Sequence, residues 1–116
     1  MQIRFKVWIE KDGKFVMGKG GYEILRAIDE FGSISKASEF LGMSYKFVWT
    51  YIRNMERILG EKVVEKVRGK EGGAKLTDVG RRLLDLYECA TINFESVAKD
   101  FERYGLGVNE MLVGCI

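Results

Sequence analysis

The stretch from Gly32 to Gly60 constrains the fold most, because its pattern predicts two short helices joined by one tight turn. Ser35 is a good N-cap for the first helix, since a serine side chain can accept a hydrogen bond from a free N–H of the first turn. We expect this helix to bury three apolar side chains, those of Ala37, Phe40 and Leu41. Gly42 then provides the positive φ that ends the helix.

The second helix of this stretch has two faces of opposite character. Ser44 caps it, and its apolar residues recur at spacings of four, three and four, which is one helical face: Val48, Ile52, Met55 and Leu59. The opposite face repeats these spacings with polar residues, three of them basic: Lys46, Thr50, Arg53 and Arg57. A short helix, a glycine turn and a second helix with a basic outer face predict a helix-turn-helix, which places its second helix in the major groove of DNA.

The residues after Gly60 predict a β-hairpin. Residues 63–67 form its first strand, residues 75–77 its second, and the loop 68–74 between them carries two bases. A hairpin directly after the second helix of a helix-turn-helix is the wing of a winged helix, whose basic side chains lie along the DNA backbone or minor groove. A disordered surface loop is the alternative.

Thr77 is placed to cap a long final helix, and Asp78 is favourable at its positive end. Along this helix, apolar residues recur at alternating spacings of four and three: Leu83, Tyr87, Ala90, Phe94, Val97, Phe101 and Tyr104. Such a heptad pattern predicts association of helices from two copies of the chain. The alternative is a long helix that packs only on its own domain. Residues 105–116 are apolar and interrupted by glycine, and the sequence leaves open whether they cover the dimer or dock a partner.

The N-terminal segment alternates apolar and polar residues. Ile3, Phe5, Val7 and Ile9 fall on one side of residues 2–9, which predicts a strand with one buried face. Asp12-Gly13 is a turn signal, and residues 15–17 return as a second strand. A helix over residues 22–31 follows, with four inward-facing side chains: Ile24, Leu25, Ile28 and Phe31. We interpret the N-terminal hairpin as structural, either padding the core or pairing across a dimer, rather than as a ligand site.

The charges are unevenly distributed along the chain. Residues 43–82 contain ten Lys or Arg and five acidic residues, whereas residues 83–116 contain two and six. Positive charge therefore gathers where contact with phosphates is expected. With 116 residues, 47% of them apolar, the chain is the size of one domain of the α+β class, mainly helical. Within it, residues 1–76 are the predicted DNA-binding winged helix with its N-terminal hairpin, and residues 77–116 the dimerisation helix and tail.

Several function classes are disfavoured by the residues present. The chain has no histidine, and its two cysteines, Cys89 and Cys115, are isolated, so we predict neither an enzyme nor a metal or other cofactor. No segment resembles a secretion signal or a membrane span, which predicts a cytoplasmic protein without a membrane partner. The formal net charge of +2 leaves open a winged-helix protein-interaction module without specific DNA binding. RNA binding is less favoured, because A-form grooves do not admit a helix in this way.

The basic outer face of the second helix favours DNA and defines the candidate contacts. Lys46, Thr50 and Arg53 are candidates for base readout, whereas Arg57 lies farther along and is expected to contact phosphate. Trp49 is expected at the edge of the core. The complete predicted set of DNA-binding residues is Ser33, Ser35, Ser44, Tyr45, Lys46, Thr50, Arg53, Arg57, Arg68, Lys70 and Lys75. Two copies joined by the final helix would read two half-sites of a pseudo-palindrome.

The order of these motifs resembles two related regulator families. The segments 32–35, 52–56 and 76–80 are similar to the DNA-binding domain of LysR-type regulators. Segments 44–49 and 69–77 are more similar to the N-terminal domain of molybdate-responsive (ModE-type) regulators, and this resemblance covers residues 3–104. It implies a homodimeric winged helix that represses or activates transcription. In the ModE-type family a separate C-terminal domain binds molybdate, and these 116 residues contain no counterpart of it, so we expect no molybdate site and leave an effector or protein partner unidentified.

Overall fold

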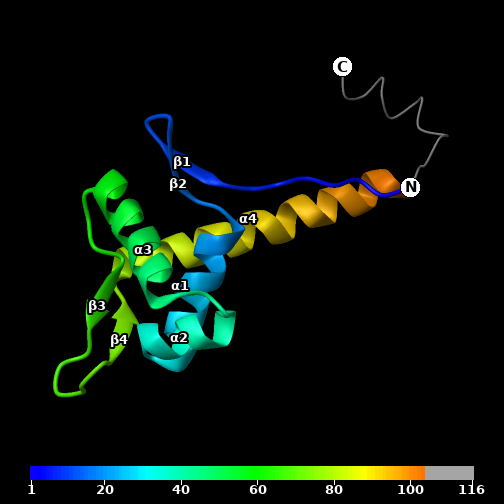
Figure 1. The fold of residues 1–116 in the computed structure, drawn as a ribbon. Helices are drawn as coiled ribbons and strands as arrows, with labels where there is room; N and C mark the ends of the chain where they lie inside the picture. The colour runs from blue at the N-terminus through cyan, green and yellow to red at the C-terminus, as the bar shows by residue number, and fades with distance from the viewer. Residues whose placement is uncertain (104–116) are drawn as a thin grey trace.

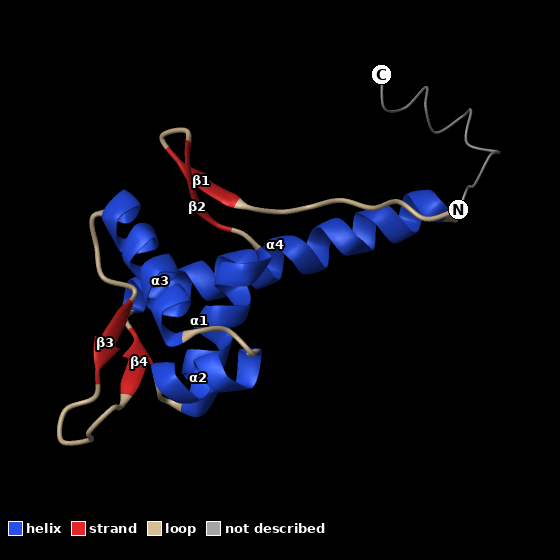
Figure 2. Cartoon of the chain, in the orientation of Figure 1, coloured by secondary structure: helices blue, strands red, loops and turns tan. Residues whose placement is uncertain are grey.

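Helices dominate the fold, and two small β-hairpins lie beside them (Figures 1 and 2). The computed structural model describes residues 1–103, so Tyr104 and the tail 105–116 lie outside the described residues. The elements are β1 (Ile9–Lys11), β2 (Lys14–Met17), α1 (Lys19–Phe31), α2 (Ile34–Leu41), α3 (Tyr45–Leu59), β3 (Val64–Lys66), β4 (Ala74–Leu76) and α4 (Asp78–Glu102). The predicted α+β class with a winged helix-turn-helix is confirmed. No helix of the described chain is long and apolar enough to cross a membrane.

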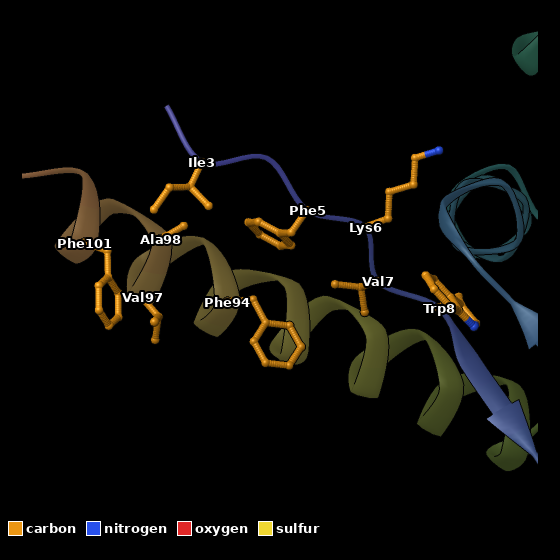
Figure 3. A pocket seen from close by; sticks show the side chains of 9 residues that line it. All are labelled: Ile3, Phe5, Lys6, Val7, Trp8, Phe94, Val97, Ala98 and Phe101. Atoms are coloured by element: carbon orange, nitrogen blue, oxygen red, sulfur yellow. The ribbon is translucent and has the colours of Figure 1, made fainter. Parts of the chain in front are cut away.

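The N-terminal hairpin is shorter than predicted. β1 and β2 pair antiparallel around a turn in which Asp12 and Gly13 both have positive φ. The predicted strand over residues 2–9 is wrong for residues 2–8. Residues 1–8 form an extended arm along the outer part of α4 (Figure 1). The arm has no partner strand in the described chain; instead the Ile3 N–H donates to the Glu102 carboxylate at 2.7 Å. Figure 3 shows this arm against α4.

The core lies where α1, α3 and the first half of α4 meet the two hairpins. Its largest fully buried side chains come mainly from β2, α1 and α3: Met17, Ile24, Leu25, Ile28, Val48, Ile52, Met55 and Val63. α1 begins at Lys19, three residues earlier than the predicted start at Tyr22. Its N-cap is Gly18, which has no side chain to accept a hydrogen bond, so the start of α1 lacks a side-chain capping bond.

The first half of α4 is attached firmly to α1. Tyr87 is buried and its ring stacks on that of Tyr22 at 5.1 Å between centroids. The Tyr22 hydroxyl donates to the Glu88 carboxylate at 2.7 Å, and Arg26 pairs with the same carboxylate at 3.1 Å. Burial and the neighbouring Glu88 raise the pKa of Tyr22, which keeps this hydroxyl protonated as a donor. A second ion pair, Arg81 with Asp29, also joins the two helices.

Candidate nucleic-acid interface

The first helix of the helix-turn-helix, α2, starts two residues earlier than its predicted cap implies. Ser33, not Ser35, is the N-cap: its hydroxyl accepts from the Lys36 N–H at 3.2 Å. Ser35 lies exposed within the helix. With this start, the buried face consists of Ile34, Ala37 and Ser38, with Leu41 half-buried. The prediction that Phe40 is buried is wrong: its side chain is 67% exposed and its ring rests on that of Phe31.

The turn and the start of α3 agree with the sequence. Gly42 has a φ of +67°, the left-handed conformation expected at the end of α2. The Met43 N–H then donates to the Ser38 carbonyl at 3.0 Å, which closes the turn. Ser44 is the N-cap of α3, and its hydroxyl accepts from the Phe47 N–H at 3.0 Å. A hydroxyl that accepts this bond still has its proton to donate to a phosphate.

The outer face of α3 is exposed as predicted. Val48, Ile52 and Met55 are fully buried, which holds the opposite side of the helix toward solvent. That side presents four exposed polar side chains together with the exposed Tyr45 at its start: Lys46, Thr50, Arg53 and Arg57. The predicted position of Trp49 at the edge of the core is confirmed, since it is half-buried and packs against the core. The Arg53 guanidinium lies 5.4 Å from the centre of the Trp49 ring, so the indole limits where this cation can go.

The predicted wing is present directly after α3. β3 and β4 pair antiparallel, with Glu65 opposite Lys75. The loop between them is closed by backbone bonds, among them Val67 N–H to the Gly73 carbonyl at 3.0 Å. Arg68 and Lys70 on this loop are exposed. Lys75 differs from them because its ammonium lies 3.7 Å from the Glu65 carboxylate and therefore already has an anionic neighbour.

Three residues at the base of the wing fix it to α3 and α4. Glu56 of α3, which the sequence analysis did not single out, accepts from the backbone N–H of Val63 at 2.9 Å. Thr77 accepts from the Gly80 N–H at 3.1 Å, as the predicted cap of α4, and its hydroxyl also donates to the Lys62 carbonyl at 2.6 Å. A Cβ on Gly80 would lie 2.1 Å from the Val63 carbonyl oxygen, so only glycine permits this approach.

These contacts give the site a rigid frame with a basic surface. The buried face of α3 packs on the core, and the wing is held beside α3 by Glu56 and Thr77. Within residues 1–103, no group of three or more side chains is arranged to hold a metal ion. The site presents a helix with exposed hydrogen-bond donors and cations, and a helix is of the size that a major groove admits.

The sequence comparisons agree with this arrangement. The family model of bacterial regulatory helix-turn-helix proteins, lysR family, matches residues 21–81, which span α1 to the first residues of α4. The chain belongs to the LysR family of bacterial regulatory helix-turn-helix proteins. This match covers the whole interface described above, from the cap of α2 to the wing.

Individual relatives and solved structures extend the comparison. The chain is 35% identical over 95 residues to the "Molybdenum transport protein ModE" of Azotobacter vinelandii, covering 80% of this chain and 34% of that protein. It is 32% identical over 90 residues to the "DNA-binding transcriptional dual regulator ModE" of Escherichia coli (strain K12), covering 76% and 34%. The chain thus spans about a third of the length of these relatives. Among LysR-type folds, it is similar to the DNA-binding domain of BenM in complex with benA site 1 DNA, with a TM-score of 0.59, 22% identity and coverage of 77% and 100%.

Proposed function

We propose that this chain is a sequence-specific regulator of transcription that binds double-stranded DNA as a homodimer. In this proposal α3 enters the major groove, and the wing formed by residues 63–77 contacts the backbone or the minor groove. We place the protein in the cytoplasm, where a bacterial regulator of its family meets DNA. The ModE relatives are about three times as long, so the proposal concerns DNA binding by the residues present and assigns no effector.

The observation that carries the proposal is the outer face of α3. Lys46, Arg53 and Arg57 all lie on the side opposite the fully buried Val48 and Ile52. A module that only docks proteins has no need to gather three cations on one exposed helical face. Lysine and arginine at this position can reach the O6 and N7 acceptors of guanine, and each good contact contributes about 1–3 kcal/mol of discrimination between bases.

The wing supports the same proposal through contacts that do not depend on the base sequence. Arg68 and Lys70 stand on a loop that projects beyond β3 and β4 (Figure 1). Cations in this position bind phosphate and release counterions, which gives affinity that falls steeply with salt. Lys75, paired with Glu65, contributes less than the other two because phosphate must compete with the carboxylate.

The homodimer rests on the outer part of α4. Leu83 and Tyr87, which belong to the heptad pattern, are buried within their own chain, so we confine the proposed contact to the later heptad residues. There Phe94 and Val97 are about half exposed, and with Ala98 and Phe101 they line an apolar groove of about 480 Å³ along the N-terminal arm (Figure 3). Burying such a surface against a second copy is favourable because apolar area leaves water. This arrangement would set two α3 helices at two half-sites.

Selection of bound fragments from the genome of the source organism tests the proposal. The purified chain is incubated with sheared genomic DNA at physiological salt, and the retained fragments are sequenced. We expect a small set of fragments that share a pseudo-palindromic sequence. Retention of fragments without any shared sequence would contradict specific DNA binding and favour the protein-interaction module.

A further inference from the structure

The first turn of α3 exposes a large apolar side chain beside its basic residues. Phe47 is 52% exposed, although the next residue, Val48, is fully buried. Its backbone N–H is held by the cap residue Ser44, which fixes it at the N-terminal end of the helix. Residues at this end are the ones that meet base edges when a helix-turn-helix binds DNA.

Phe47 is held on one side and open on the other. Its ring meets that of Tyr51 edge to face, at 6.2 Å between centroids. Tyr51 is itself anchored, because its hydroxyl accepts from the Gly18 N–H at 3.3 Å, at the junction of β2 and α1. The Phe47 ring therefore has a fixed support on the side of the N-terminal hairpin, while its other side is exposed one turn before Thr50.

The surroundings of Phe47 favour DNA over an apolar protein partner as its occupant. The outer face of α3 beside Phe47 is polar, with Lys46, Thr50 and Arg53 exposed on it, so an apolar partner that spread over this face would have to desolvate cations. DNA can contact both the cations and the exposed ring, and its phosphates pair with the cations. In its major groove the C5 methyl group of thymine is the apolar group that a side chain can contact.

We propose that Phe47 reads thymine, by packing its ring against C5 methyl groups in the major groove of the operator. This inference rests on the proposed function and adds to it a residue that determines specificity together with the kind of base that it recognises. The operator half-site is then expected to carry one or two thymines that Phe47 contacts, beside the bases that Lys46 and Arg53 contact.

The test uses thymine and deoxyuridine, which differ only by the C5 methyl group. In an operator fragment selected by the protein, each thymine of a half-site is replaced singly by deoxyuridine, and binding is measured at one fixed salt concentration. For the unmodified protein we expect a loss of about fourfold at a contacted thymine, the value of one buried methyl group. Phe47→Ala should bind the unmodified operator less tightly and show no further loss with deoxyuridine at that position. Phe47→Leu, which stays apolar, should retain part of the preference.

Matched variants separate this contact from a structural role and from the neighbouring Thr50. Phe40→Ala removes a still more exposed phenylalanine from α2 and should leave the loss on deoxyuridine replacement unchanged. Thr50→Ser lacks the methyl group of Thr50, so a loss that disappears in this variant and persists in Phe47→Ala would assign the thymine to Thr50 and overturn the proposal. The proposal would also be overturned if Phe47→Ala weakened binding to all duplexes equally and kept the full loss of affinity at every thymine replaced by deoxyuridine. If the unmodified chain retains no specific fragment, the proposed function itself fails.

Discussion

Gly80 is the position where a single methyl group should damage the fold most. An alanine Cβ there would lie 2.1 Å from the Val63 carbonyl oxygen, whereas real contacts of this kind are well above 3 Å. The clashing atom is backbone at the base of the wing, and the Thr77 N–H donates to that same carbonyl at 3.0 Å. Relief therefore requires α4 or the wing to move as a unit.

The size of the effect follows from two opposing terms. Forcing an extra methyl group into a packed site costs about 1–3 kcal/mol and occasionally more, and a contact with rigid backbone belongs at the upper end. Alanine gains about 1 kcal/mol over glycine within a helix. We therefore expect Gly80→Ala to lower the free energy of unfolding by about 2 kcal/mol, which corresponds to a fall in Tm of about 10 °C for a domain of this size.

Urea denaturation, followed by circular dichroism, measures this difference against a matched control. Gly20 also lies inside a helix, but a Cβ there would meet only a Tyr51 ring carbon at 3.8 Å, an ordinary contact. Gly20→Ala should leave stability unchanged or raise it by about 0.4–1 kcal/mol. Equal midpoints for Gly80→Ala and Gly20→Ala would refute the close packing of α4 against the base of the wing.

Three further predictions concern the cap, the wing and the dimer. Ser33→Ala should cost about 1 kcal/mol in urea denaturation, whereas Ser35→Ala should cost nothing, because only Ser33 caps α2; the reverse order would contradict the capping geometry. Arg68→Ala should reduce the slope of log binding constant against log salt concentration by about one, for any duplex sequence; an unchanged slope would remove Arg68 from the phosphate contacts. Phe94→Glu together with Phe101→Glu should convert the dimer to a monomer in analytical ultracentrifugation, and a persistent dimer would place the interface elsewhere.

The sequence predicted the helix-turn-helix because its signals there are local. Gly42 ends one helix and Ser44 begins the next, and the spacing of Val48, Ile52 and Met55 leaves one orientation for α3. The start of α4 was predicted for the same reason, because the Thr77 side chain caps the first turn of the helix that directly follows it. In each case the interacting residues lie within four positions of one another.

The errors arise where the outcome depends on distant partners. The alternation of residues 2–9 shows which side chains lie on the same side of this segment. A strand also needs a neighbouring strand to pair with. The arm instead lies against the helix α4 (Figure 3). Ser33 and Ser35 are equally good caps in isolation, and the packing of Ile34 into the core decides between them. The role of Glu56 could not be predicted, because its carboxylate binds the backbone N–H of Val63, and the sequence pattern does not show such a bond.

The heptad pattern of α4 shows the same limit in another form. One continuous pattern crosses two different surfaces, since Leu83 and Tyr87 pack on their own domain, whereas Phe94 and Val97 lie exposed beside the N-terminal arm. Periodicity reveals which face of a helix is apolar. It does not reveal which neighbour covers that face, so the domain contact and the proposed dimer contact look alike in the sequence.

The central claim is that the outer face of α3 reads DNA, and binding of a selected operator fragment by charge-reversed variants tests it most directly. Lys46→Glu with Arg53→Glu changes two exposed side chains on this face. Lys99→Glu with Arg103→Glu makes the same charge change at the far end of α4, on the side of the helix away from Phe94 and Val97. We expect the first variant to lose specific binding while it keeps the helical content and Tm of the unmodified chain, and the second to bind within a few fold of it. Equal binding by the two variants would contradict the assignment of α3 as the recognition helix.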